Sequence, residues 1–108
     1  MPLTELQHGM SVRELALVHS ILATWLPTRE VRMFGSRARG TPKPYSDLDL
    51  VIMGDVAVPM STLGQLKEAF AAADLPWRVD VLDWADTSAD FKSHIANHST
   101  LLPTSKPR

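Results

Sequence analysis

The sequence predicts an α/β protein of the α+β type, a small mixed β-sheet flanked by helices. Apolar residues make up 44% of the 108 residues and charged residues 21%, which is ordinary globular composition. Short apolar runs typical of strands alternate with helical periodicity, in the order helix, strand, short helical turn, strand, helix, strand, helix. We expect a single domain over residues 1–98 and a flexible tail over residues 99–108, which carries two prolines.

Bulk properties exclude several classes of protein. The net charge of −1 lacks the basic excess of a dedicated DNA-binding protein, and the absence of cysteine excludes disulfides and thiolate metal sites. The apolar runs are too short to span a membrane, and the N-terminus does not resemble a secretory signal. We therefore expect a cytoplasmic protein with access to nucleoside triphosphates and magnesium.

The first predicted elements are a helix and a short strand. Ser11 and Glu14 have the spacing of a capping box at the helix start. One apolar face follows at helical spacing, made by Leu15, Val18, Leu22 and Trp25. Pro27 ends this helix, and the strand over residues 31–34 is broken by Gly35.

The next strand, residues 48–53, is nearly all apolar after Asp49, as expected for a central strand covered on both faces. The pattern then predicts a helix over residues 61–73, a strand over residues 77–84, and a last helix that begins at a Thr87 or Ser88 cap and includes Phe91 and Ile95.

Residues 35–50 read GSRARGTPKPYSDLDL and combine a turn, a basic loop and two carboxylates. Because side chains alternate along a strand, Asp47 and Asp49 point the same way, with Cα atoms roughly 6.5 Å apart. Such a pair suits two divalent ions about 3.5–4 Å apart, and magnesium prefers carboxylate and phosphate oxygens. Taken alone, Asp-Leu-Asp is better interpreted as two solvated aspartates at the start of a strand.

The Gly-Ser turn favours the metal interpretation. Gly35 permits a sharp turn and a close approach of ligand to backbone, and Ser36 offers a hydroxyl and an amide to a triphosphate. Arg37 and Arg39 add positive charge, although either is equally compatible with the surface. We assign phosphate contact to Arg37 and expect Arg39 to be structural or to face solvent.

A third carboxylate completes the predicted site. Asp80 is expected to face the other two and to act as a metal ligand or general base, whereas strand parity puts its rival Asp83 on the opposite face. The alternative for Asp80 is an exposed side chain or one paired with Arg78.

Together, Gly35-Ser36, Asp47, Asp49 and Asp80 resemble the signature of the DNA polymerase beta-like nucleotidyltransferase superfamily. The forms GSRARG…SDLDL and VDVLDW look most like the minimal nucleotidyltransferases (MNT), often the antitoxin half of HEPN/MNT toxin–antitoxin pairs. The resemblance is strong over residues 31–84 and looser in the flanking helices.

This resemblance implies ATP as substrate, two Mg²⁺ ions held by the three aspartates, and triphosphate binding at Gly35 and Ser36. It implies transfer of a nucleoside monophosphate to a hydroxyl, with tyrosine of a partner HEPN ribonuclease as acceptor in the antitoxin branch. No appended acceptor-binding domain is evident, so we expect a partner to present the hydroxyl.

Two other functions remain open. The chain is compatible with a binding module that neutralises a ribonuclease by contact alone, and less so with a small-molecule nucleotidyltransferase of the aminoglycoside-modifying type. His94 and His98 have the spacing of a zinc pair, but a surface position on the last helix is favoured. The three tryptophans are expected in the core or at a partner interface rather than stacked on adenine.

Overall fold

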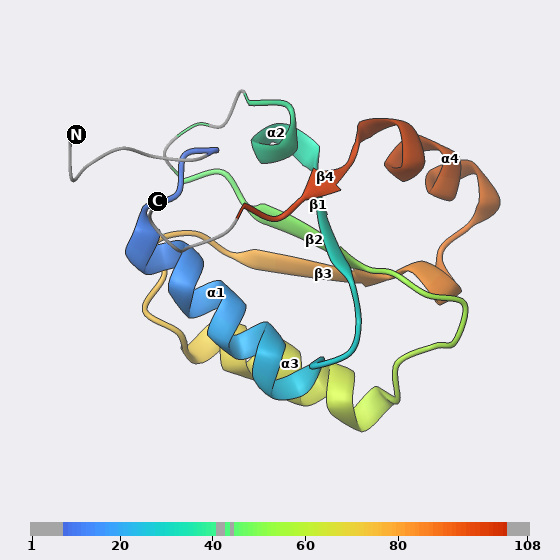
Figure 1. Ribbon diagram of the computed structural model, residues 1–108, viewed down its shortest axis with the longest axis horizontal. Coiled ribbons are helices and arrows are strands. Elements are labelled where there is room, and N and C mark those ends of the chain that lie inside the picture. Colours follow the sequence, from blue (N-terminus) through green and yellow to red (C-terminus); the bar gives the residue numbers. More distant parts are fainter. Residues whose placement is uncertain (1–7, 41–42, 44, 104–108) are drawn as a thin grey trace.

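The computed structural model describes residues 8–40, 43 and 45–103. Helices and strands alternate along this part of the chain, as Figure 1 shows. In chain order they are α1 (Val12–Trp25), β1 (Val31–Phe34), α2 (Gly35–Ala38), β2 (Leu48–Ile52), α3 (Met60–Ala72), β3 (Val79–Asp83), a 3-10 turn (Trp84–Asp86), α4 (Ala89–His98) and β4 (Thr100–Leu101).

The four strands form one mixed sheet in the order β3-β2-β1-β4. Strand β1 is antiparallel to both of its neighbours, β2 and β4, whereas β2 and β3 run parallel and are connected through α3. The predicted class, a small mixed sheet flanked by helices, is confirmed.

The helices lie on both faces of this sheet (Figure 1), with α1 and α3 on one face and α2 and α4 on the other. Leu48, Leu50 and Ile52 of β2 enter the larger core, which is shared with α1 and α3. Val51 points to the opposite face and packs with Phe34 and Ile95. The expectation that this strand is central and covered on both faces is therefore confirmed.

The helix starts follow the predicted caps. Ser11 Oγ accepts a hydrogen bond from the Glu14 amide at 3.1 Å, and Glu14 Oε1 accepts one from the Ser11 amide at 2.9 Å, which completes the capping box. Ser88, one of the two predicted caps, accepts a hydrogen bond from the Phe91 amide at 3.2 Å. Both helices therefore begin where local side-chain chemistry satisfies their free amides.

The bounds of three elements differ from the prediction. Helix α3 covers Met60–Ala72 and so begins and ends one residue earlier, and β2 ends one residue earlier, at Ile52. The strand predicted over residues 77–84 covers only Val79–Asp83. Its two ends are wrong because Trp77 lies buried before the strand, and the Asp83 side chain caps a 3-10 turn that begins at Trp84.

The predicted flexible tail is wrong for its first five residues. Thr100 and Leu101 form β4 and pair with Met33 and Arg32 at the edge of the sheet. Arg32 Nε donates to Ser99 Oγ at 2.9 Å, and His19 Nε2 lies 2.6 Å from the Pro103 carbonyl oxygen. Residues 99–103 therefore belong to the fold, and residues 104–108 lie outside the described part.

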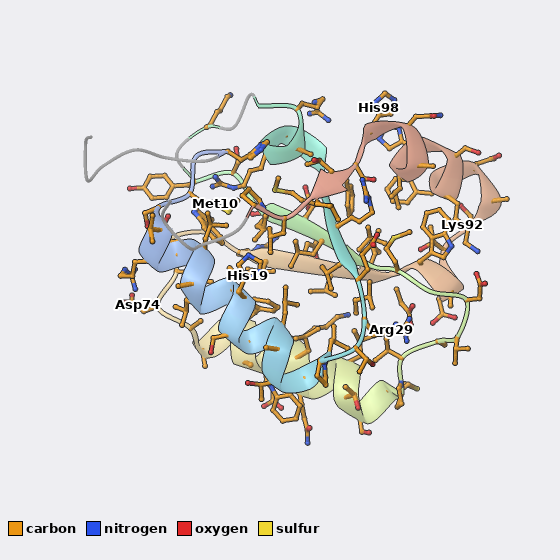
Figure 2. All side chains as sticks on the ribbon, in the orientation of Figure 1. Met10, His19, Arg29, Asp74, Lys92 and His98 are labelled. Carbon is orange, nitrogen blue, oxygen red and sulfur yellow. The ribbon has the colours of Figure 1, made fainter. Side chains whose placement is uncertain are left out.

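Helix α4 carries His94 and His98 on its exposed side, where Figure 2 shows His98 pointing away from the sheet. Their rings are 4.8 Å apart, and His94 stacks on Phe91. The predicted surface position of this pair is confirmed. Within the described residues, none of the helices has both the length and the apolar character needed to cross a membrane.

Candidate active site

The turn after β1 lies directly against Asp49, the aspartate on strand β2. Gly35 has φ of +77°, a conformation that L side chains rarely adopt. A Cβ atom added to Gly35 would collide with Asp49 Oδ2 and lie 3.2 Å from Asp49 Cγ. Glycine is therefore required here both for the backbone conformation and for the space that the carboxylate occupies.

Asp49 and Asp80 lie side by side on neighbouring strands. Asp49 is opposite Phe34 in the β1–β2 register and opposite Asp80 in the β2–β3 register. Burial raises the pKa of Asp49 above its ordinary value, as do the negative charges of Asp80 and Asp47, whereas Arg39 lowers it. The charge of Asp49 is therefore influenced by Asp80, Asp47 and Arg39.

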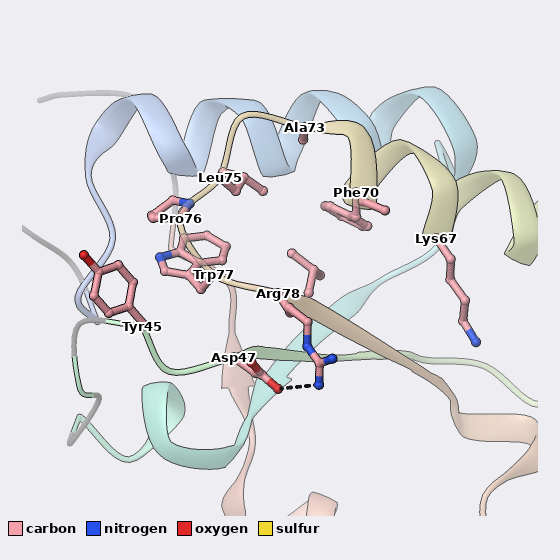
Figure 3. Close-up of a pocket in the computed structure, with 11 residues that line it drawn as sticks. Tyr45, Asp47, Lys67, Phe70, Ala73, Leu75, Pro76, Trp77 and Arg78 are labelled. Carbon is pink, nitrogen blue, oxygen red and sulfur yellow. Dashed lines mark ion pairs between the residues drawn. The ribbon is translucent and has the colours of Figure 1, made fainter.

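Asp47 makes an ion pair with Arg78, the residue just before β3. Its Oδ2 lies 3.7 Å from Arg78 Nη2, and the two side chains are 40% and 87% exposed (Figure 3). Exposed pairs of this kind contribute little stability and are easily exchanged. In the described part of the chain no group of three potential ligands converges on one point. The Asp47 carboxylate is thus weakly held, and it does not converge with Asp49 and Asp80 on one point in this structure.

Asp83 has a different role from Asp80, although both lie on β3. Its side chain is buried, and its two carboxylate oxygens accept hydrogen bonds from the Val58 amide at 2.7 Å and the Ala85 amide at 3.2 Å. The predicted separation of Asp80 and Asp83 onto opposite faces is confirmed. Asp83 stabilises the loops beyond β2 and β3 and does not face the other carboxylates.

Arg37 is not placed where the sequence predicted a phosphate contact. Its side chain is fully buried, and its Nε and Nη2 donate to the Ser46 carbonyl at 3.1 and 2.8 Å, while Nη1 donates to the His8 carbonyl at 3.0 Å. The phosphate role assigned to Arg37 does not fit this arrangement, because its donors are directed at backbone carbonyls. Arg39 is the exposed arginine of this turn, so the expectation that it faces solvent is confirmed.

The sequence holds no signal that shows which of the two arginines is buried and which is exposed. They flank Ala38 in a symmetrical Arg-Ala-Arg triplet. What distinguishes them is tertiary: the Arg37 guanidinium carbon lies 4.8 Å from the ring centre of Trp77, which is itself buried in the core. The expected core position of Trp77 is confirmed, and Trp25 and Trp84 are half-buried against the two cores.

A cavity of about 400 Å³ opens beside Asp47, at the outer edge of β3 (Figure 3). This volume lies within the range of small-molecule binding sites. Its charged lining groups are Asp47, Lys67 and Arg78, and the remaining lining is mostly apolar or aromatic: Tyr45, Phe70, Ala71, Ala73, Leu75, Pro76, Trp77 and Val79. Of the three predicted carboxylates only Asp47 lines this cavity, which lies on the α3 side of the sheet.

The donor set has the chemistry that a hard divalent cation requires. Asp49 and Asp80 come from adjacent strands, Asp47 directly precedes β2, and the Gly35 turn approaches Asp49 closely. In the described residues, no side chain accepts a hydrogen bond from the first amides of α2. These amides therefore remain free to bind an anionic ligand. The donor types are thus those that magnesium prefers, and the turn offers free backbone amides beside them.

Comparison with known proteins agrees with this chemistry. Residues 17–102 match the family model described as nucleotidyltransferase domain. The chain is 51% identical over 89 residues to a probable protein adenylyltransferase, MntA, of Haemophilus influenzae, and the match covers 82% of this chain and 78% of the relative.

Similar folds occur in crystal structures of toxin–antitoxin complexes. One was determined with AMP-PNP and matches with a TM-score of 0.68 at 21% identity, over 83% of this chain and 73% of that one. A mutant of the MntA-HpeT toxin–antitoxin matches with a TM-score of 0.64 at 22% identity, over 81% and 69%. At this level of identity, the likeness shows a shared fold.

Proposed function

The chain belongs to the nucleotidyltransferase domain family, and from this premise we propose that it transfers AMP from ATP to a hydroxyl group of a partner protein. The observation that carries the proposal is the placement of Asp49, directly opposite Asp80 and pressed against the Gly35 turn. This placement brings carboxylates from two strands to the point where the backbone turn would receive a triphosphate.

Two Mg²⁺ ions, held by Asp47, Asp49 and Asp80, would neutralise charge on the phosphate oxygens. Asp80 lies on the exposed edge strand, where it can accept the proton of the incoming hydroxyl as general base. The acceptor oxygen then forms a bond to the α-phosphorus, the bond from that phosphorus to the bridging oxygen breaks, and pyrophosphate leaves with both electrons.

The triphosphate contacts follow from the turn. Gly35 and Ser36 supply backbone amides and a hydroxyl at the start of α2. The positive charge comes from Arg39, which is exposed and acts on Asp49, in place of the buried Arg37. Phosphate binding is thus divided between a backbone turn and one exposed arginine.

The acceptor we propose is a tyrosine of a HEPN-type toxin, which makes this chain an antitoxin that acts in the cytoplasm. Support comes from the relative named as a protein adenylyltransferase and from toxin–antitoxin complexes of the same fold. The cavity beside Asp47 has the size and the aromatic lining to receive a side chain near that carboxylate.

The direct test is incubation of the chain with Mg²⁺, ATP labelled at the α-phosphate and a purified HEPN partner. We expect label on the partner and none with the Asp47→Asn/Asp49→Asn double variant, which should remain folded because both side chains are partly exposed. Absence of transfer by the wild-type chain with Mg²⁺ or Mn²⁺, or persistent transfer by the double variant, would contradict the proposal.

A second function, neutralisation by contact alone, is favoured by apolar side chains exposed before and at the start of α3. Val56 is 76% exposed and Met60 is 89% exposed, which suits burial against a partner. The double variant separates the two functions in cells that express the toxin. Full protection by this variant favours contact, whereas loss of protection favours adenylylation.

A further inference from the structure

Arg37 is a buried cation at the side of the carboxylate site. It is fully buried and packs on Trp77, and the described residues include no carboxylate within ion-pair distance of it. Removing a charge from water is costly unless hydrogen bonds replace the lost hydration. Its position therefore depends on the three hydrogen bonds that its guanidinium donates to backbone carbonyls.

Two of these bonds end on the carbonyl of Ser46, the residue immediately before Asp47. Because the Ser46 carbonyl and the Asp47 amide belong to one planar peptide unit, the guanidinium fixes the orientation of the backbone that carries Asp47. Among the described residues, the other hydrogen bonds of Ser46 are local: its amide donates to the Lys43 carbonyl at 3.1 Å and its hydroxyl accepts from the Lys43 amide at 2.8 Å. Arg37 thus links this loop to the core.

Arg37 also connects both halves of the site. It follows Ser36 on α2, and its own carbonyl lies 2.6 Å from His8 Nδ1 while its guanidinium donates to the His8 carbonyl. The turn that would receive the triphosphate and the loop that leads to Asp47 are therefore joined through one side chain. We propose that Arg37 is a positioning residue, which holds Asp47 in the orientation required to bind a divalent cation. This inference rests on the proposed function.

The chain contains a matched control for this role. Arg29 donates through Nε to the Met53 carbonyl and through Nη2 to the Val56 carbonyl, both at 2.9 Å, just beyond the C-terminal end of β2. Each arginine thus donates at least two hydrogen bonds to backbone carbonyls next to an end of β2. Only Arg37 binds a carbonyl that directly precedes a predicted metal ligand, Asp47. Arg37 is fully buried and Arg29 half-buried, so a purely structural role predicts a difference in thermal stability alone, whereas the positioning role predicts a difference in Mn²⁺ binding as well.

The experiment measures Mn²⁺ binding by paramagnetic resonance and thermal unfolding for Arg37→Met, Arg37→Lys, Arg29→Met and the wild-type chain. Methionine fills the buried space without a charge, and lysine keeps the charge but loses the planar fork. We expect Arg37→Met to weaken Mn²⁺ binding by about tenfold, as for loss of a group that orients a metal ligand. Arg37→Lys should be intermediate, and Arg29→Met should bind Mn²⁺ as the wild type does.

A second measurement tests whether Arg37 acts through Asp47. In an Asp47→Asn background, Arg37→Met should weaken Mn²⁺ binding by less than twofold, because the ligand that it orients is already lost. If Arg37→Met does not fold, the same comparison is made with Arg37→Lys. Equal Mn²⁺ affinity in folded Arg37 variants and wild type, or an equal loss in Arg29→Met, would overturn the inference. Because Mn²⁺ binding needs no acceptor, failure of adenylyl transfer alone would count only against the proposed function.

Discussion

The two ends of β2 are built from the same kinds of groups and use them differently. Each end has an arginine that donates to backbone carbonyls, Arg37 before the strand and Arg29 after it. Each has a glycine with positive φ packed against a charged side chain, Gly35 against Asp49 and Gly54 against Arg29. The ends differ in what their carboxylates bind.

At the C-terminal end, the protein satisfies its carboxylate internally. Asp83 is opposite Ile52 in the register and accepts hydrogen bonds from two backbone amides. At the N-terminal end, Asp49 is opposite another carboxylate, that of Asp80, and Asp47 has a weak pair with exposed Arg78. Like charges placed together oppose folding unless a cation joins them. The carboxylates at the N-terminal end are thus the ones left available for a ligand.

The largest effect should come from exchanging the two aspartates of β3 for asparagine, one at a time. Asp80→Asn should lower transfer by roughly 100-fold or more, the usual contribution of a positioned general base, with little change in stability. Asp83→Asn should lower the free energy of unfolding by about 1–3 kcal/mol, because one buried amide loses its acceptor, and should leave the folded chain active. Transfer assays and denaturant unfolding measure both. If Asp83→Asn inactivates the folded chain as strongly as Asp80→Asn, the assignment of Asp80 to catalysis and Asp83 to stability is wrong.

The second-largest effect is expected from replacing the glycines at the two ends of β2, Gly35 and Gly54, with alanine. Alanine at Gly35 or Gly54 should destabilise the fold by roughly 1–2 kcal/mol, since each glycine has positive φ and an added Cβ meets a charged side chain. Only Gly35→Ala displaces Asp49, so we expect it to lower the transfer rate by about 10–100-fold below the unfolding temperature. Gly54→Ala, which displaces Arg29, is the control. An equal loss of rate in both variants would show that backbone strain alone accounts for the effect.

Features of the site that depend on local periodicity were predictable from sequence. Strand alternation separated Asp80 from Asp83, because the period of a strand is two whatever the strand packs against. The capping box of Ser11 is likewise local, since its partner Glu14 lies three residues away.

Features that depend on residues distant in the sequence were not predictable from the sequence. The difference between Arg37 and Arg39 is set by the positions of Ser46 and Trp77, which come from other elements. Strand β4 was missed because two residues carry no periodic signal, and its partner β1 lies far away in the sequence. In both cases the missing information is which backbone groups remain free for pairing once the rest of the chain has folded.

Arg39 tests the phosphate side of the N-terminal end. Arg39→Ala should raise the KM for ATP by roughly tenfold, through loss of a charge-assisted hydrogen bond, and change stability by no more than about 0.5 kcal/mol, because the side chain is exposed. Steady-state kinetics with varied ATP and thermal unfolding check both parts. Arg13→Ala, at an exposed arginine that pairs with Asp74, is the control and should leave the KM unchanged. A normal KM in Arg39→Ala would remove Arg39 from the site.

The smallest effect concerns the exposed pair between Arg78 and Asp47, which has an equivalent elsewhere in the chain. Arg13 lies 3.7 Å from Asp74, the same separation as Arg78 from Asp47, and both arginines are largely exposed. Replacing either arginine with glutamine should change the free energy of unfolding by less than about 1 kcal/mol.

Only Arg78→Gln removes a cation that competes with a metal for Asp47, so the Mg²⁺ concentration for half-maximal transfer should fall by about twofold in that variant alone. Both the freed carboxylate and the lost repulsion between cations act in this direction. A rise in the Mg²⁺ requirement would instead mean that Arg78 binds the substrate. Arg78 would then contact the substrate beside the carboxylates at the N-terminal end, rather than being displaced from Asp47 by the metal.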